Sequence, residues 1–105
     1  MLIQKALAEI IGTFAMIFVG GGSILLSERY PNIIPAYIVP IVWGLTICLM
    51  IFAVGRISGA HFNPAVTLAF VVSKRLPMTQ LLLYWGSQFL GGLVAIGLLQ
   101  VLKKI

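Results

Sequence analysis

The sequence predicts an all-α membrane protein with three transmembrane helices and one re-entrant half-helix. Hydrophobic residues make up 61% of the 105, against only seven basic and two acidic residues. A soluble domain carries about a quarter charged residues. Three long apolar runs each match the ~20 residues that cross a bilayer. Between the second and third runs lies a shorter segment with an Asn-Pro pair, which is a signal for the start of a helix.

The three predicted spans cover residues 6–26, 35–55 and 77–102, within a single domain of residues 1–105. The first run is interrupted only by Glu9, the second holds no charge, and the third has Gln80, Gln88 and Gln100 as its polar points. An ionisable group inside a span is expensive and usually functional. We expect Glu9 to accept hydrogen bonds from the re-entrant loop. The alternatives are a position near the interface, where it caps loose amides, and a proton relay.

Residues 56–75 form the predicted re-entrant segment, which contains SGAHFNPAVTLAF at 58–70. Asn63 is expected to be the N-cap of a helix that begins at Pro64. A helix over residues 64–73 would be ~15 Å long, about half of the hydrocarbon core. Non-helical backbone at that depth is tolerated only where protein buries it or water reaches it. We therefore expect residues 55–62 to descend as a loop and the helix to return toward Lys74.

The chemistry of this helix start favours a pore. If the side-chain oxygen of Asn63 accepts from the amide of Ala65 or Val66, its NH₂ donors point away from the helix. The helix N-terminus adds roughly half a positive charge. Both effects favour neutral solutes with acceptor oxygens and oppose cations, so we expect Asn63, Pro64 and Ala65 at the pore centre. An ordinary cap on an ordinary helix is the alternative for an Asn-Pro pair taken alone.

The sequence leaves the roles of His61 and Trp43 open, and it assigns a set of small residues to helix packing. His61 either lines the inner vestibule or bonds a backbone carbonyl, and it is expected to line the pore together with Gly59. Trp43 belongs to an aromatic belt or projects into the pore. Small residues four apart allow close helix approach, as in Ala8-x-x-x-Gly12, Ser87-x-x-x-Gly91 and Gly91-x-x-x-Ala95.

Several function classes have no support in the sequence. Cys48 is alone, so no disulfide framework or metal cluster is expected, and there is no phosphate loop or catalytic dyad. The net charge of +5 comes from basic residues scattered at segment ends, which fits membrane ends better than nucleic acid. We expect no enzymatic activity, cofactor, metal or nucleic acid. We expect an integral membrane protein of a prokaryotic cytoplasmic (inner) membrane.

Four segments together resemble the first half of an aquaporin or glycerol facilitator, the major intrinsic protein family. They are AEIIGTF at 8–14, IVWGL at 41–45, SGAHFNPAVT at 58–67 and SQFLGG at 87–92. The resemblance implies one of the two inverted repeats of the aquaporin fold and a pore for water and small neutral solutes. Trp43 stands where glycerol facilitators and nodulin-like plant members have a constriction Trp. Glycerol-like solutes are therefore implied.

The resemblance also implies a second half, because full-length relatives hold two repeats, each with its own Asn-Pro-Ala, around a midplane site. The second half is expected to be another copy, a different half-chain or a further segment of the same protein. Lys5, Arg56, Lys74 and Arg75 are predicted on one side of the membrane, and Arg29, Lys103 and Lys104 on the other. With almost no positive-inside bias, an antiparallel homodimer is favoured. Family tetramers imply four pores and eight chains.

In such a dimer, position by position, the resemblance implies a constriction at each mouth. Trp43 of one copy would meet Ile51, Ala60 and Val66 of the other. Val66 stands where the second repeat of the family carries an Arg, so this constriction would lack a fixed positive charge. The alternative functions are a non-conducting membrane interaction protein, a half-channel with a different partner half, and a transporter subunit that uses Glu9 as a proton site.

Overall fold

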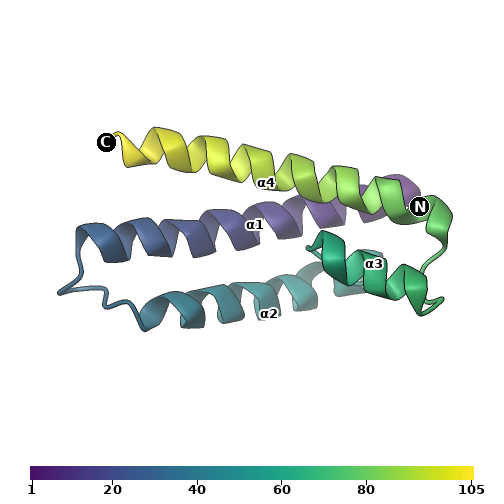
Figure 1. The fold of residues 1–105 in the computed structure, drawn as a ribbon, viewed down its shortest axis with the longest axis horizontal. Coiled ribbons are helices and arrows are strands. Elements are labelled where there is room, and N and C mark those ends of the chain that lie inside the picture. The colour runs from purple at the N-terminus through teal and green to yellow at the C-terminus, as the bar shows by residue number, and fades with distance from the viewer.

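The computed structural model describes residues 1–105, which fold into helices with no strand. The elements are α1 (Leu2–Arg29), α2 (Ile38–Ser58), α3 (Pro64–Val72), the 3₁₀ turn η1 (Met78–Gln80) and α4 (Leu81–Lys103). In Figure 1, α1 lies between α2 and α4, and α3 is tucked against one end of the bundle. The molecule measures 47 × 24 × 21 Å.

Three segments are long and apolar enough to cross a membrane: α1, α2 and the run from η1 through α4. Their outward faces carry large apolar side chains, including Leu49, Phe52 and Leu82. In lipid such faces are expected, because apolar side chains suit the hydrocarbon core and the helices satisfy their backbone polar groups internally. By contrast, α3 has nine residues and is only about 14 Å long. The predicted fold class, three spans and a half-helix, is confirmed.

The small residues on α1 and α4 let these two helices come into backbone contact. A Cβ atom added at Gly91 would lie 2.5 Å from the carbonyl oxygen of Ile10. The members of the three small-residue pairs are all buried: Ala8, Gly12, Ser87, Gly91 and Ala95. Close approach, rather than hydrophobic burial, is the usual basis of helix association in lipid. Close helix approach is thus confirmed at Gly91, whereas a Cβ atom at Gly12 would meet the Phe62 ring of the loop and not another helix.

The beginning of the re-entrant loop differs from the prediction. The structure continues α2 through Gly55 and Arg56 to Ser58, so the loop comprises only residues 59–63. Gly55 does not end the helix, because its carbonyl accepts the amide of Gly59 at 2.9 Å. The helix ends at Gly59, whose φ of +89° is in the left-handed region that glycine adopts without a steric cost. The expected descent from residue 55 is therefore wrong by four residues.

The ends of the spans also differ from the predicted bounds. Helix α1 covers residues 2–29 rather than 6–26, and α2 covers residues 38–58 rather than 35–55. The third span, η1 together with α4, covers Met78–Lys103 and agrees with the predicted 77–102 to within one residue. Polar residues at the ends of α1 continue the helix into the interfacial region, which hydropathy alone does not delimit. Pro77 has extended backbone and precedes η1, so α4 begins only after this short turn.

Candidate functional site: the re-entrant loop and the tip of the half-helix

The half-helix α3 starts at Asn63, which has extended backbone and a side chain that caps the helix. Its Oδ1 accepts the Ala65 amide at 2.8 Å, and Pro64 occupies the first helical position. Asn63 is exposed. Because the cap uses the oxygen, the two donors of the side-chain NH₂ remain for other partners. The N-cap at Asn63 and the helix start at Pro64 are those that the Asn-Pro pair predicts.

The loop before this cap has a backbone conformation that few residues adopt. Gly59 has φ +89°, Ala60 φ +56° and Phe62 φ +53°. A non-glycine residue in the left-handed region costs on the order of 1–3 kcal/mol and persists only where its surroundings enforce it. Two such residues lie within five positions, so the loop depends on tertiary contacts for its shape.

Glu9 of α1 supplies most of those contacts. Its side chain is fully buried and accepts the Ser58 hydroxyl at 2.7 Å, the His61 amide at 3.1 Å and the Phe62 amide at 2.8 Å. The side-chain amide of Gln88 donates to it as well, at 2.8 Å. A buried carboxylate is tolerated only when such donors satisfy it. The hydrogen bonds that sequence analysis expected from the loop to Glu9 are present.

A second cluster holds His61 away from the surface. Its Nδ1 lies 3.0 Å from Thr67 Oγ1, and its ring stacks on Phe70 at 4.3 Å between centroids and tilts against Tyr84. The Gln88 side chain also donates to Thr67 Oγ1, at 2.9 Å. The imidazole is buried, and its hydrogen-bond partner within the chain is the Thr67 hydroxyl rather than a backbone carbonyl.

Helix α4 anchors both sides of the loop through residues that sequence analysis missed. The Tyr84 hydroxyl donates to the Ser58 carbonyl at 2.6 Å, and Trp85 Nε1 donates to the Pro64 carbonyl at 3.0 Å. Gln88 was noted only as a polar point in the third span. A signal for these roles was present in the sequence. Tyr84 and Trp85, two aromatic residues with polar tips, lie one helical turn before Gln88 in an otherwise apolar run.

The loop separates its donors from its acceptors. The amides of Ala60, His61 and Phe62 donate to the side chains of Ser58 and Glu9. The carbonyl oxygens of residues 59–62 accept no hydrogen bond within the chain. Backbone acceptors without partners at membrane depth require water, solute or another protein segment. This row of free carbonyls leads to Asn63.

A hollow of about 440 Å³ lies beside Asn63 and Pro64, between α1, the tip of α3 and α4. Thr13 and Gln88 line it, and both are buried. Thr13 Oγ1 and Gln88 Oε1 have no hydrogen-bond partner within the chain. The remaining lining is mostly apolar, with Met16, Ile17, Phe62, Phe89, Gly92, Leu93 and Ile96.

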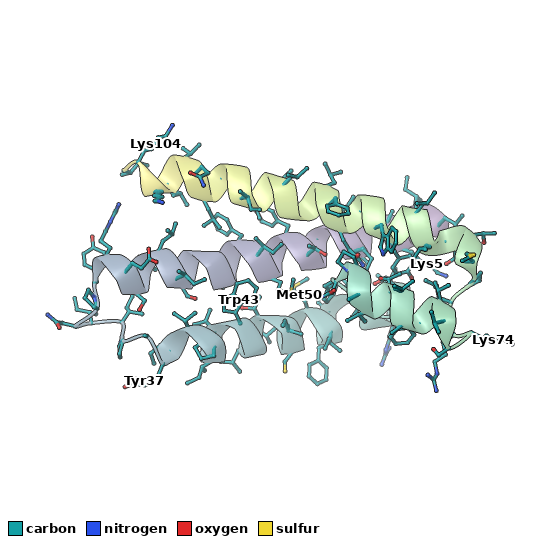
Figure 2. The ribbon with its side chains drawn as sticks, in the orientation of Figure 1. Lys5, Tyr37, Trp43, Met50, Lys74 and Lys104 are labelled. Atoms are coloured by element: carbon teal, nitrogen blue, oxygen red, sulfur yellow. The ribbon has the colours of Figure 1, made fainter.

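The four residues expected at a constriction do not meet within one chain. Trp43 points from α2 toward α1 (Figure 2), where its ring occupies the space beside Gly20. Ile51 and Ala60 both border Gly55, where an added Cβ atom would lie 3.6 and 3.8 Å from their side chains. Ile51 follows Trp43 by eight residues in α2, which is about 12 Å along the axis. Val66, in the first turn of α3, is exposed.

The profile of the major intrinsic protein family matches residues 1–105, the whole chain. The chain belongs to the major intrinsic protein family. It is similar to aquaporin NIP1-1 of Zea mays, with 48% identity over 100 residues, which are 95% of this chain and 36% of that protein. It is 44% identical to nodulin-26 of Glycine max over 100 residues, 95% of this chain and 37% of that protein.

A third relative of this major intrinsic protein is aquaporin NIP3-1 of Arabidopsis thaliana, 41% identical over 99 residues, which are 94% of this chain and 31% of the relative. The chain thus spans about a third of the length of the curated relatives that it matches. The family resemblance stated from the four sequence segments is confirmed. With its apolar helices, the chain is an integral membrane protein.

Proposed function

We propose that this chain forms one half of a membrane pore for the passive flow of water and small neutral solutes such as glycerol. One observation carries the proposal: a strained loop with free carbonyls leads to a helix cap whose NH₂ donors are also free. Neither arrangement is viable against lipid. The pore centre is Asn63 with Pro64 and Ala65, and the backbones of Gly59 and His61 line the approach.

The chemistry of this path favours solutes that both donate and accept hydrogen bonds. The carbonyls of residues 59–62 accept from a hydroxyl group, and the Asn63 NH₂ donates to its oxygen. The N-terminus of α3 adds a partial positive charge, which opposes cations at the same point. Glu9 is not exposed to this path, because loop amides, Ser58 and Gln88 surround it. We therefore assign it a structural role and not a proton relay.

A second half is part of the proposal. Thr13 Oγ1 and Gln88 Oε1 are buried without partners beside the tip of α3, and each such atom costs about 1–3 kcal/mol. A second half that closes the hollow with polar groups or enclosed water removes this cost. We propose an antiparallel second copy, because the two ends of the bundle carry four and three basic residues and give little orientational bias.

The separation of Trp43 from the other constriction residues supports the same pairing. In an antiparallel pair, Trp43 of one copy would come to the mouth where Ile51, Ala60 and Val66 of the other copy lie. That constriction is apolar and lacks an Arg. Four such pores from eight chains would correspond to the tetramer that the family resemblance implies. Nodulin-26, NIP1-1 and NIP3-1 are plant proteins and give no support for a prokaryotic inner membrane, which stays a prediction.

The test is stopped-flow measurement of water and glycerol flux into liposomes that contain the purified chain. Asn63→Asp is the informative variant, because Asp is an equally good N-cap and leaves the helix start intact. In a pair it brings two carboxylates together, which cannot both ionise easily. We expect glycerol flux to fall and cation leak to rise. The matched control is Asn32→Asp, the only other Asn, in the exposed α1–α2 connection.

Each outcome discriminates between the alternatives. No flux above empty liposomes would support a non-conducting membrane interaction protein. Flux that appears only after addition of a second, different chain would support a half-channel with a different partner half. Equal glycerol flux in Asn63→Asp and Asn32→Asp, without new leak, would mean that Asn63 is only a cap. A particle mass equal to an odd number of chains would exclude the homodimer.

A further inference from the structure

We propose that the turn after α3 binds the headgroup of an anionic phospholipid. A hollow of about 510 Å³ opens at this turn, and its lining combines Lys74 and Arg75 with Val72, Leu76 and Met78. It lies at the opposite end of α3 from Asn63 and takes no part in the proposed pore. The inference therefore stands whether or not the chain conducts solutes.

Backbone hydrogen bonds hold the turn that carries Lys74 and Arg75 in place. Lys74 has φ +63°, and its amide donates to the Val71 carbonyl at 3.1 Å. The amides of Arg75 and Leu76 both donate to the Phe70 carbonyl, at 2.8 and 3.2 Å. The Leu76 side chain is buried beneath the turn. A fixed turn reduces the ordering that ligand binding requires.

The charges at this turn have no partner in the chain. Lys5 and Lys74 lie at the same end of the bundle (Figure 2). The side chains of Lys74 and Arg75 make no hydrogen bond or ion pair, while Lys5 donates to Gln80. The chain has only two carboxylates. Glu9 is buried in the loop network, and Glu28 lies at the far end of α1. No exposed carboxylate competes for these cations, so the end of the bundle is complementary to an anion.

The apolar flanks point to a lipid rather than a soluble anion. Val72 and Met78 are 74% and 71% exposed on either side of the basic pair. The turn lies where α3 returns to the end of the bundle, level with the N-terminal end of α1 (Figure 1), which is headgroup depth in a spanning protein. A phospholipid satisfies both features at once, with its phosphate on Lys74 and Arg75 and its acyl chains against Val72 and Met78. Basic pockets at such membrane ends attract anionic lipids.

The experiment is native mass spectrometry of the purified chain with phosphatidylglycerol or phosphatidylcholine of the same acyl composition. We expect the wild type to retain phosphatidylglycerol preferentially. Lys74→Gln with Arg75→Gln should reduce that retention roughly 25-fold, since each basic residue next to an anionic headgroup contributes a factor of roughly five. The matched control, Lys103→Gln with Lys104→Gln, removes the same charge from the other end and should leave retention at the wild-type level. Circular dichroism checks that both double variants fold.

Three results would overturn the proposal. The first is equal retention of the two lipids by the wild type, which would leave the basic pair as an orientation signal only. The second is an equal loss in both double variants, which would indicate general surface charge. The third is full competition by millimolar inorganic phosphate, which would mean that the turn recognises free phosphate and not a lipid. Val72→Ser with Met78→Ser separates the apolar contribution: it should weaken lipid retention with the charge unchanged, and an unaltered retention would count against an acyl contact.

Discussion

A single carboxylate, Glu9, enforces the shape of the re-entrant loop. It accepts the Ser58 hydroxyl and the amides of His61 and Phe62, on a loop that holds two non-glycine residues at positive φ. Because the amides turn toward Glu9, the carbonyls of the same residues turn away from it without partners. One buried side chain on α1 thereby produces the polar row that we assign to the pore.

We expect Glu9→Gln to destabilise the protein by about 2–3 kcal/mol, since it replaces a charged acceptor by a neutral group with a donor facing buried donors. Water flux should fall with the loss of loop order. Thermal unfolding in detergent, followed by circular dichroism, measures the first effect and stopped-flow the second. The control is Glu28→Gln, which changes the only other carboxylate, at an exposed position, and should stay within about 0.5 kcal/mol of wild type. Equal stability of the two variants would remove the supporting role of Glu9.

Val66 is the residue that most distinguishes the proposed constriction from that of two-repeat relatives. We expect Val66→Arg to place a permanent cation with five donors at the mouth. Proton leak should fall because the charge repels protons, water flux should persist, and glycerol flux should drop because the mouth narrows. Liposome assays of water, glycerol and proton flux in wild type and Val66→Arg check this. Identical rates in wild type and Val66→Arg would mean that the assignment of the constriction by position fails for this chain.

At the level of elements, local features were readable from sequence and distant partners were not. The start of α3 was predictable because a cap joins residues two apart, Asn63 and Ala65. The end of α2 was not, because Gly55 resembles a helix breaker but keeps its intrahelical hydrogen bond in an apolar segment. The roles of Tyr84 and Trp85 were not predictable, because their acceptors lie 26 and 21 residues away in the sequence. Only the topology brings them to the loop.

The α1–α4 contact is the element-scale feature that admits the sharpest test. A Cβ at Gly91 would meet the backbone of Ile10 at 2.5 Å and of Phe14 at 3.1 Å, and backbone cannot move aside as a side chain can. We expect Gly91→Ala to cost about 1–3 kcal/mol through helix separation. Gly97→Ala, on the same helix but with open space around its Cβ, should be neutral or stabilising by up to about 1 kcal/mol. Thermal unfolding of the two variants measures the difference, and a similar cost for both would show that the helices are not in close contact at Gly91.

For the whole molecule, the distribution of charge connects the fold to the proposed assembly. Lys5 and Lys74 lie at one end of the bundle, and Lys104 lies at the other (Figure 2). If the near-equal split leaves insertion unbiased, both orientations coexist in one membrane. A cysteine added after Ile105, in a Cys48→Ser background, should be labelled by an impermeant reagent from both sides. Labelling from one side only would exclude antiparallel copies, whatever the flux.

The same charge balance can be used as a lever on activity. Ile3→Lys with Gln4→Lys adds two cations to the end of the bundle that already carries four basic residues. More chains should then insert in one orientation, and fewer antiparallel pairs can form. We expect water flux per chain to fall. Adding Asn32→Lys and Ile33→Lys, both exposed in the α1–α2 connection, restores the balance and should restore the flux, although the total charge is higher still. The quadruple variant thus controls for a direct effect of charge on folding or conduction. Flux that declines in the double variant without recovering in the quadruple variant would contradict a pore built from oppositely oriented copies.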